Sequence, residues 1–274
     1  MSTQPTLAFI GAGNMARAII GGLISNGYPT DNIWATATRL ENLADLQAQG
    51  LNTTTDNNDA IANADIVILA VKPQIMKAVC QTIAATVQSR QPLIVSVAAG
   101  ITSASLEQWL GGDIALVRCM PNTPSLVQKG ASGLCANSMV TEIQRQQTTQ
   151  ILNAVGLTLW VEQEAQLDAV IAVSGSGPAY YFMVMEAMVA AGEKLGLSKE
   201  IAAQLTIQTA LGAAEMASQS DVEPAELRRR VTSPNGTTEQ AIKTFQQEGL
   251  IELFDKAMQA CHDRAITMAE ELGK

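Results

Sequence analysis

Glycines near the start of the chain have a spacing that suits phosphate binding. Residues 10–16 read IGAGNMA, follow a short apolar run and open a helical pattern, which gives GxGxxA between a strand and a helix. In this pattern Gly11 permits the tight turn, Gly13 lets the backbone approach a pyrophosphate, and Ala16 allows close helix packing. N–H groups at the helix start would bind the phosphates. The segment predicts a dinucleotide site, against the alternative of a tight turn without a ligand. The expected contacts are Gly11, Ala12, Gly13, Asn14 and Met15.

The end of the second apolar run indicates which dinucleotide binds. NAD enzymes place an acidic residue there, about 20 residues past the glycines, to bind the ribose 2′-hydroxyl. Here residues 35–39 read ATATR, and Glu41 is expected to form a capping box with Thr38. Thr36, Thr38 and Arg39 are suited to hold a 2′-phosphate through hydroxyls and a guanidinium. NADPH is therefore the predicted cofactor and NADH the alternative; Arg39 as a solvated surface charge is the competing interpretation.

Two later apolar runs end toward the same crevice, because ligands of open α/β sheets bind at the carboxyl ends of the strands. Residues 70–73 read AVKP, where the proline stops strand pairing, and residues 97–100 read VAAG, which leaves room for a flat ring or a ribose. Lys72 has three open roles: a catalytic group, a ligand contact or a local cap of the strand. The further cofactor contacts expected here are Ala70, Val71, Lys72, Pro73 and Ala98.

A second anion site is predicted in the later half of the chain. Residues 231–240 read VTSPNGTTEQ, in which Pro-Asn-Gly indicates a turn and Thr237-x-x-Gln240 a capping box that opens a helix. The N–H groups of Thr238 and Glu239 would remain free to bind a carboxylate. A well-capped surface helix is the alternative. Residues 174–180, SGSGPAY, favour a structural use, with the proline in the first turn of a helix; close approach of a ligand or a partner backbone is the alternative.

Short apolar runs that alternate with helical patterns predict the elements that position these residues. The expected strands are 7–10, 33–37, 52–55, 66–71, 93–99, 115–119 and 157–161, and a second capping box is expected at Thr141-x-x-Gln144. Nearly continuous apolar strands are typical of a parallel sheet covered on both faces. We expect a doubly wound α/β dinucleotide-binding domain over 1–163 and an all-helical dimerisation and substrate domain over 164–274.

Residues 180–196 are predicted to form a helix that is apolar on most faces. We expect this helix to be buried against another subunit; a central helix within one domain is the alternative.

Composition and charge exclude several classes of function. The chain has 274 residues and a formal net charge of −9, and it has no Lys/Arg-rich block, so nucleic acid and anionic membrane surfaces are not expected partners. The single histidine, His262, argues against a histidine-based metal site or a Ser–His–Asp triad, and we expect no metal. Four cysteines without CxxC spacing are expected to be buried free thiols. We see no signal peptide or membrane-spanning run and expect a cytoplasmic protein.

Together these motifs resemble the pyrroline-5-carboxylate reductase family over nearly the whole chain. The resemblance rests on residues 9–16, 70–74, 118–124, 174–180 and 231–238, the last continued through Ala241, Ile242 and Phe245. It implies an NAD(P)H-dependent reduction of 1-pyrroline-5-carboxylate to proline, the last step of proline biosynthesis. It also implies an N-terminal nucleotide domain, a C-terminal domain that dimerises, often into larger rings, and an active site between the nucleotide crevice and the Ser/Thr loop.

The resemblance also implies roles for individual residues. Asn57 corresponds to an asparagine near the adenosine 2′-phosphate. The implied substrate contacts are Glu164, Thr237 and Thr238, and Ser233 and Gly236 of the same loop are further expected contacts. Thr238 corresponds to the catalytic threonine, whose hydroxyl would hydrogen-bond the ring nitrogen. Many family members have Gly-Gly where this chain has Asn235-Gly236; because asparagine tolerates positive φ, the turn should survive.

Two other functions compete with this interpretation. The 3-hydroxyacid dehydrogenases also join such a domain to helices, but they use a catalytic lysine early in the helical half. Lys194 and Lys199 are the first lysines there, and neither lies in a matching motif. A non-catalytic NADP sensor would need the crevice but not the loop at 233–238, so that loop argues against it.

Overall fold

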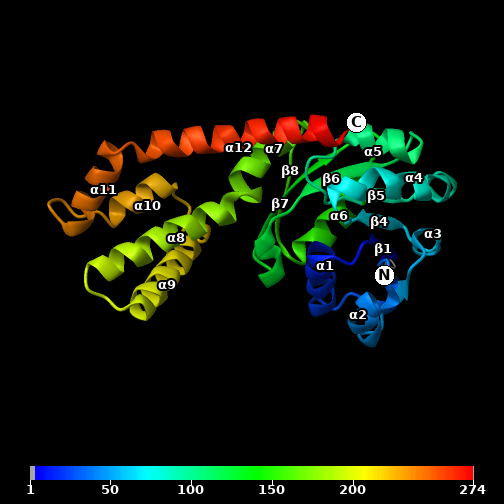
Figure 1. The fold of residues 1–274 in the computed structure, drawn as a ribbon, viewed down its shortest axis with the longest axis horizontal. Helices are drawn as coiled ribbons and strands as arrows, with labels where there is room; N and C mark the ends of the chain where they lie inside the picture. Colours follow the sequence, from blue (N-terminus) through cyan, green and yellow to red (C-terminus); the bar gives the residue numbers. More distant parts are fainter. Residues whose placement is uncertain (1–3, 274) are drawn as a thin grey trace. The chain divides into compact units, whose positions relative to one another are not determined.

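A computed structural model describes residues 4–273, which form two compact units (Figure 1). The first unit contains the described residues up to Ser176 together with those from Cys261 onward, and the second unit is Gly177–Ala260. The return of the last helix to the first unit is fixed by contacts: the Cys261 thiol lies 3.2 Å from the Ser176 hydroxyl. The functional division at 163/164 stays a prediction, since compactness alone does not define it.

An eight-stranded sheet forms the centre of the first unit, in the order β3-β2-β1-β4-β5-β6-β7-β8 (Figure 1). Its strands are β1 (Leu7–Ile10), β2 (Ile33–Thr36), β3 (Asn52–Thr54), β4 (Ile66–Leu69), β5 (Leu93–Ser96), β6 (Leu116–Met120), β7 (Gly130–Ala136) and β8 (Gly156–Trp160). All neighbouring strands are parallel except β6 and β7, which are antiparallel. The order reverses at β1, from which the chain first moves outward to β2 and β3 and then crosses to β4 and β5.

Helices cover both faces of this sheet, as the apolar strands predicted. Alternate residues of β1 point to opposite faces: Leu7 and Phe9 belong to one core cluster, and Ala8 and Ile10 to the other. The helical elements of the first unit are α1 (Asn14–Ser25), η1 (Thr30–Asn32), η2 (Leu40–Leu43), α2 (Ala44–Ala48), α3 (Asn57–Ala62), α4 (Pro73–Arg90), α5 (Ser103–Leu110), η3 (Thr123–Val127), α6 (Glu142–Asn153), α7 (Gln166–Val170) and the π-helical η4 (Ile171–Gly175). Helices α1, α2 and α6 pack on the first cluster, and α3, α4 and α5 on the second. The expectation of a doubly wound domain is confirmed.

The predicted strands are present, but several end earlier than expected. The runs predicted at 66–71 and 93–99 stop at Leu69 and Ser96, and their last residues form the loops at the carboxyl edge of the sheet. The prediction missed β7, whose sequence GASGLCA is poor in strand-forming residues. Its glycine at position 133 is required by packing, because a Cβ there would lie 2.7 Å from both methyl groups of Val170.

Of the two capping boxes predicted in this unit, one is confirmed and one is wrong. Thr141 caps α6, and Gln144 returns the hydrogen bond to the Thr141 backbone. Thr38 and Glu41 form no such box: residues Leu40–Leu43 form a short 3-10 helix preceded by Arg39, with no side-chain cap. The sequence pattern matched there, but the chain makes its tight turn one residue later than a Thr38 cap requires.

The described part of the second unit contains only helices, which confirms the all-helical expectation. Its helices are α8 (Gly177–Lys194), α9 (Lys199–Ser218), α10 (Pro224–Arg230), α11 (Thr237–Gln247) and the first part of α12 (Leu250–Leu272). Within a single chain, α8 exposes large apolar side chains: Tyr181, Phe182 and Met183 are 69%, 64% and 73% exposed. A helix central to its own domain would not leave these side chains in water, so its own unit does not provide the cover. Among the described helices, none combines the length and apolarity needed to cross a membrane.

Candidate active site

The glycine turn between β1 and α1 is shaped by the backbone of the neighbouring strand end. Gly11 has φ +94°, and a Cβ there would lie 2.8 Å from Val71 Cγ1 and 3.2 Å from the Ala70 carbonyl. Gly13 has ordinary extended backbone angles, and the nearest atom to an added Cβ is the Ala70 oxygen at 3.9 Å. Gly11 is thus required by the fold, whereas Gly13 leaves open space next to the helix start. No side chain caps α1, so its first N–H groups are available to phosphate.

Thr36, at the end of β2, supports this turn. The N–H of Gly11 donates to the Thr36 hydroxyl at 3.1 Å, and the N–H of Ala12 donates to the Thr36 carbonyl at 2.9 Å. The Thr36 side chain is almost fully buried and engaged. It is therefore poorly placed for the phosphate contact predicted from sequence, which stays untested. Thr38 and Arg39, which follow, are exposed.

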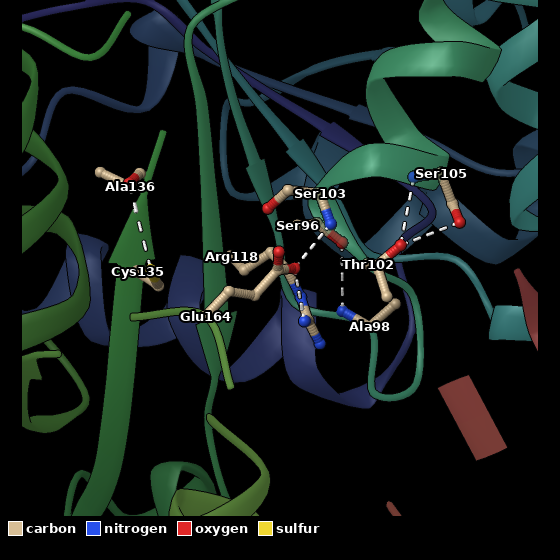
Figure 2. A network of polar contacts seen from close by, with 9 residues as sticks. All are labelled: Ser96, Ala98, Thr102, Ser103, Ser105, Arg118, Cys135, Ala136 and Glu164. Atoms are coloured by element: carbon tan, nitrogen blue, oxygen red, sulfur yellow. Dashed lines mark hydrogen bonds and ion pairs between the residues drawn. The ribbon is translucent and has the colours of Figure 1, made fainter. Parts of the chain in front are cut away.

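Strand order brings most of the predicted cofactor residues to one edge of the sheet. Asn57 begins α3 two residues after Thr55, and Lys72 immediately precedes Pro73 at the start of α4. Ala98 follows β5 and is buried, with its N–H donating to the Ser96 hydroxyl at 3.4 Å (Figure 2). Because β3, β2, β1, β4 and β5 are adjacent and parallel, the loops that carry these residues lie in a row at the carboxyl edge. The residues in those loops and at the helix starts that follow them, from β3 to β5, are Asn57, Arg39, Gly11, Ala12, Gly13, Asn14, Met15, Ala70, Val71, Lys72, Pro73 and Ala98.

Glu164 lies in a charged network beside the same edge, shown in Figure 2. One carboxylate oxygen, Oε1, accepts a hydrogen bond from the Ser103 N–H at 2.6 Å and from Arg118 Nη1 at 2.7 Å. The Arg118 side chain is 8% exposed and the Glu164 side chain 35%. The carboxylate also lies at the N-terminus of α5, where the helix dipole stabilises negative charge. The network ties the segment after β8 to β6 and α5.

Arg118 begins the run 118–124 that carries the family resemblance, but the sequence predicts no role for it. It is a single charge inside the otherwise apolar run LVRCM of β6. A buried arginine needs a carboxylate partner, and this pattern was the signal that could have identified it. The partner is Glu164, which lies 46 residues away in sequence.

Replacing Arg118 with methionine should lower the free energy of unfolding by about 2 kcal/mol. Breaking a fully buried pair costs about 3–5 kcal/mol, and the cost is smaller here because Glu164 is 35% exposed. Arg264→Met is the control, because its pair with Glu271 is more than half exposed at both ends and should contribute far less to stability. Urea titrations at one protein concentration measure both changes. Equal losses in the two variants would contradict a special role for the Arg118 pair.

The small-residue run after α7 has a structural use. Asn122 connects two loops: its Nδ2 donates to the Ser174 carbonyl at 2.9 Å, and its Oδ1 accepts from the Ala131 N–H at 2.9 Å. An added Cβ at Gly175 would lie 3.0 Å from Met120 Cε. Small residues are therefore needed where the π-helical turn η4 packs against the end of β6.

In the second unit, the Ser/Thr loop forms the turn that the sequence predicted, but not the cap. Asn235 has φ +59°, which confirms that asparagine sustains the turn in place of glycine. Helix α11 begins at Thr237 after an uncapped Gly236, so the Thr237–Gln240 capping box is wrong. Instead, the Asn235 N–H donates to Glu239 Oε2 at 3.0 Å.

The start of α11 nevertheless presents donors of the predicted kind. The Gln240 N–H bonds to the Gly236 carbonyl, so the N–H groups at 237–239 precede the helical hydrogen-bond ladder. Ser233, Thr237 and Thr238 are exposed. Lys243 lies 3.1 Å from Glu239 and holds the pKa of that carboxyl below its usual value, so the charge next to the helix start is offset.

The three buried cysteines are not suited to nucleophilic chemistry. Burial raises the pKa of Cys80 and of Cys119 to about 12, and it also raises the pKa of Cys135. All four cysteines, including the half-buried Cys261, are free thiols. Protonated buried thiols are inert, so any reaction at this site depends on other groups.

Comparison with known proteins agrees with this arrangement. Residues 164–268 match the family model for pyrroline-5-carboxylate reductase dimerisation, and residues 6–100 match that for NADP oxidoreductase, coenzyme F420-dependent. The chain is 57% identical to the pyrroline-5-carboxylate reductase of Pseudomonas aeruginosa over 275 aligned residues, which cover 100% of both chains.

Two solved structures are similar over almost the whole chain. A pyrroline-5-carboxylate reductase from Coxiella burnetii has a TM-score of 0.95 and 46% identity, covering 97% of this chain and 99% of its own. The Plasmodium falciparum pyrroline carboxylate reductase with NADP bound has a TM-score of 0.84 and 28% identity, covering 97% and 98%. Because it is 57% identical to one member over its full length, the chain belongs to the pyrroline-5-carboxylate reductase family.

Proposed function

We propose that this chain reduces 1-pyrroline-5-carboxylate to proline with NADPH, as the last step of proline biosynthesis. The observation that carries the proposal is the 57% identity to a pyrroline-5-carboxylate reductase over the whole chain. The open glycine turn and the donor-rich start of α11 supply the two anion sites that this reaction needs.

The cofactor is assigned to the carboxyl edge of the sheet. The nearest atom to a Cβ added at Gly13 is the Ala70 carbonyl oxygen at 3.9 Å, and this open space is where the pyrophosphate would lie. The uncapped N–H groups of α1 would bind it, and Thr38 and Arg39 would bind the 2′-phosphate. A NADP-bound structure of a relative supports the choice of NADPH over NADH.

The substrate is assigned to the Ser/Thr loop. It is a cyclic imine that bears a carboxylate, and the N–H groups at 237–239 would fix that carboxylate. Ser233, Gly236 and Thr237 line the turn from which these groups point. Glu164 stays a proposed substrate contact: its Oε1 already accepts two hydrogen bonds, so its Oε2 is the oxygen left for a ligand.

Positioning accounts for most of the catalysis in this proposal. When bound, the reduced nicotinamide supplies the hydride that the imine carbon receives. Protonated imines are good electrophiles, so the protein must chiefly align the reactants and exclude other orientations. The Thr238 hydroxyl would hydrogen-bond the ring nitrogen as the C=N bond becomes single and the nitrogen becomes an amine. A threonine hydroxyl is a weak acid, so the proton itself would come from water.

An absorbance assay separates this function from its rivals. The purified chain should consume NADPH when 1-pyrroline-5-carboxylate is added and should form proline in equal amount. It should not reduce NADP with a 3-hydroxyacid. Activity with the hydroxyacid alone would favour a dehydrogenase of that class, and binding of NADPH without turnover of either substrate would favour a sensor.

The family's dimerisation region makes the chain a homo-oligomer, and we expect the apolar side chains of α8 to lie in its interface. Phe182→Glu should therefore weaken self-association by roughly 100-fold, because buried aromatic side chains contribute most to such interfaces. Light scattering coupled to size exclusion measures the mass of the assembly.

Glu186→Gln, on the same helix, is the matched control and should leave the mass unchanged. An unchanged mass for Phe182→Glu would place this face of α8 outside the interface. Assembly of dimers into larger rings, a cytoplasmic location and the lack of a nucleic-acid partner are further parts of the proposal. Free thiols and the net charge of −9 support the last two.

A further inference from the structure

Arg17, in the first turns of α1, makes three polar contacts through its guanidinium. Its Nε donates to the Ala12 carbonyl at 3.0 Å, and its Nη2 donates to the Asn42 carbonyl at 2.5 Å. Its Nη1 pairs with the Asp45 carboxylate. The guanidinium therefore connects the glycine turn to the segment that follows β2, across 25 and 28 residues of sequence.

Arg17 adds a contact in the middle of this segment, whose start is held by the Thr36 bonds to Gly11 and Ala12. Residues Leu40–Leu43 form a single 3-10 turn without a side-chain cap, and Leu40 is 58% exposed. Leu43 and Leu46 are its buried anchors. The turn begins directly after Arg39, so its position on one side and the Thr36 bonds on the other set where Thr38 and Arg39 lie relative to the glycine turn.

The guanidinium groups of Arg17 and Arg39 differ in whether the protein itself engages them. All three nitrogens of the Arg17 guanidinium are engaged by the protein, and this contact holds the pKa of the Asp45 carboxyl below its usual value. Arg39 is exposed, and within residues 4–273 its guanidinium has no hydrogen-bond or ion-pair partner. Arg39 is thus available to a ligand, and Arg17 is not.

We propose that Arg17 is a positioning residue that makes the chain prefer a 2′-phosphorylated dinucleotide. It holds the post-β2 turn at a fixed distance from the glycine turn. A dinucleotide whose pyrophosphate lies on α1 then presents its 2′-phosphate to Thr38 and Arg39. The inference rests on the proposed cofactor site, but it concerns binding and not the reaction. A lysine cannot replace the arginine, because a compact ammonium group lacks the planar fork that reaches two carbonyls at once.

Calorimetric titration of the purified chain with NADP⁺ and with NAD⁺ tests this directly. For Arg17→Lys and Arg17→Met, the Kd for NADP⁺ should rise roughly tenfold, because a displaced contact loses most of its value. The Kd for NAD⁺ should change less than about twofold, since NAD⁺ has no 2′-phosphate to misplace. Asp45→Asn is the matched control: it keeps both carbonyl contacts of Arg17 and removes a half-exposed charge, so both Kd values should stay near those of the unchanged chain.

Each other outcome overturns the inference. Equal weakening of both dinucleotides would show that Arg17 only maintains the turn, and unchanged Kd values would show that it has no influence on the site. Failure of the unchanged chain to prefer NADP⁺ would remove the preference itself. Thermal melts of the variants exclude general unfolding. If NADP⁺ binds as described but 1-pyrroline-5-carboxylate is not reduced, the proposed reaction fails and this inference stands.

Discussion

Replacing Thr238 with alanine is expected to lower kcat roughly 100-fold, with little change in the affinity for NADPH. The size of the loss follows from removal of one aligned hydrogen bond to an atom whose charge changes in the reaction. Thr238 is exposed in the first turn of α11, in the second unit, whereas the glycine turn is in the first. Turnover and cofactor binding should therefore respond differently. Steady-state rates measure the loss of kcat, and calorimetric titration measures the retained affinity for NADPH.

Thr244→Ala provides the matched control. Thr244 lies two turns further along α11, and its hydroxyl donates to the Gln240 carbonyl within the helix. Its loss should leave kcat within about twofold, because an exposed substitution of this kind changes little. If Thr238→Ala turned over substrate as fast as the unchanged chain, Thr238 would have no catalytic role and the loop would serve binding alone.

Gly13→Val is expected to abolish measurable NADPH binding while the fold stays intact. Backbone angles at Gly13 are in the extended region open to any residue, and the nearest protein atom to an added Cβ is 3.9 Å away. A Cβ therefore fits the free protein, and the methyl groups that it carries in valine should occupy the space assigned to the pyrophosphate. We expect the Kd for NADPH to rise at least about 100-fold and Tm to change by less than about 4 °C, as for a surface substitution.

Gly11→Ala should instead destabilise the fold itself. Its φ of +94° and the 2.8 Å approach to Val71 Cγ1 strain the turn itself, so Tm should fall by several degrees before any ligand is added. A Gly13→Val variant that bound NADPH normally would show that phosphates do not lie on α1. A variant that lost its fold would show that Gly13, like Gly11, is structural.

The nucleotide half could be predicted because independent patterns coincide there. The glycine spacing at residues 11–16, the apolar run before it and the helical pattern after it agree on one turn, which is present. Thr36 was chosen for its hydroxyl, but that hydroxyl supports Gly11 from inside. Spacing identifies a residue near a site, and burial then decides whether its side chain faces a ligand or the protein.

The features that the sequence did not predict depend mainly on tertiary packing. Strand β7 is poor in β-branched and aromatic residues. Its Gly133 is explained by Val170, which is distant in sequence, whereas Gly130 is explained by the nearby Ser125 together with the Val155 carbonyl. The Arg118–Glu164 pair likewise spans 46 residues. Local patterns do not show such contacts, because their energy comes from tertiary neighbours.

Two predicted helix caps are wrong for a local reason. Both Thr38-x-x-Glu41 and Thr237-x-x-Gln240 fit the capping-box pattern, but in neither case is the threonine the residue before the helix. Gly236 precedes α11 instead, and Glu239 bonds back to Asn235. The capping-box pattern predicts a helix start to within a residue or two, and the conformation of the preceding turn determines which residue caps the helix. For the proposed site the error has little effect, because N–H donors still face outward at 237–239.

Transfer of a labelled hydride tests the central claim most directly. NADPH that carries deuterium at the transferred position of its nicotinamide is mixed with the purified chain and 1-pyrroline-5-carboxylate, and the product is examined by mass spectrometry. The account predicts proline with one deuterium on the former imine carbon for each NADPH consumed. Proline without the label, or NADPH left unconsumed, would contradict the account.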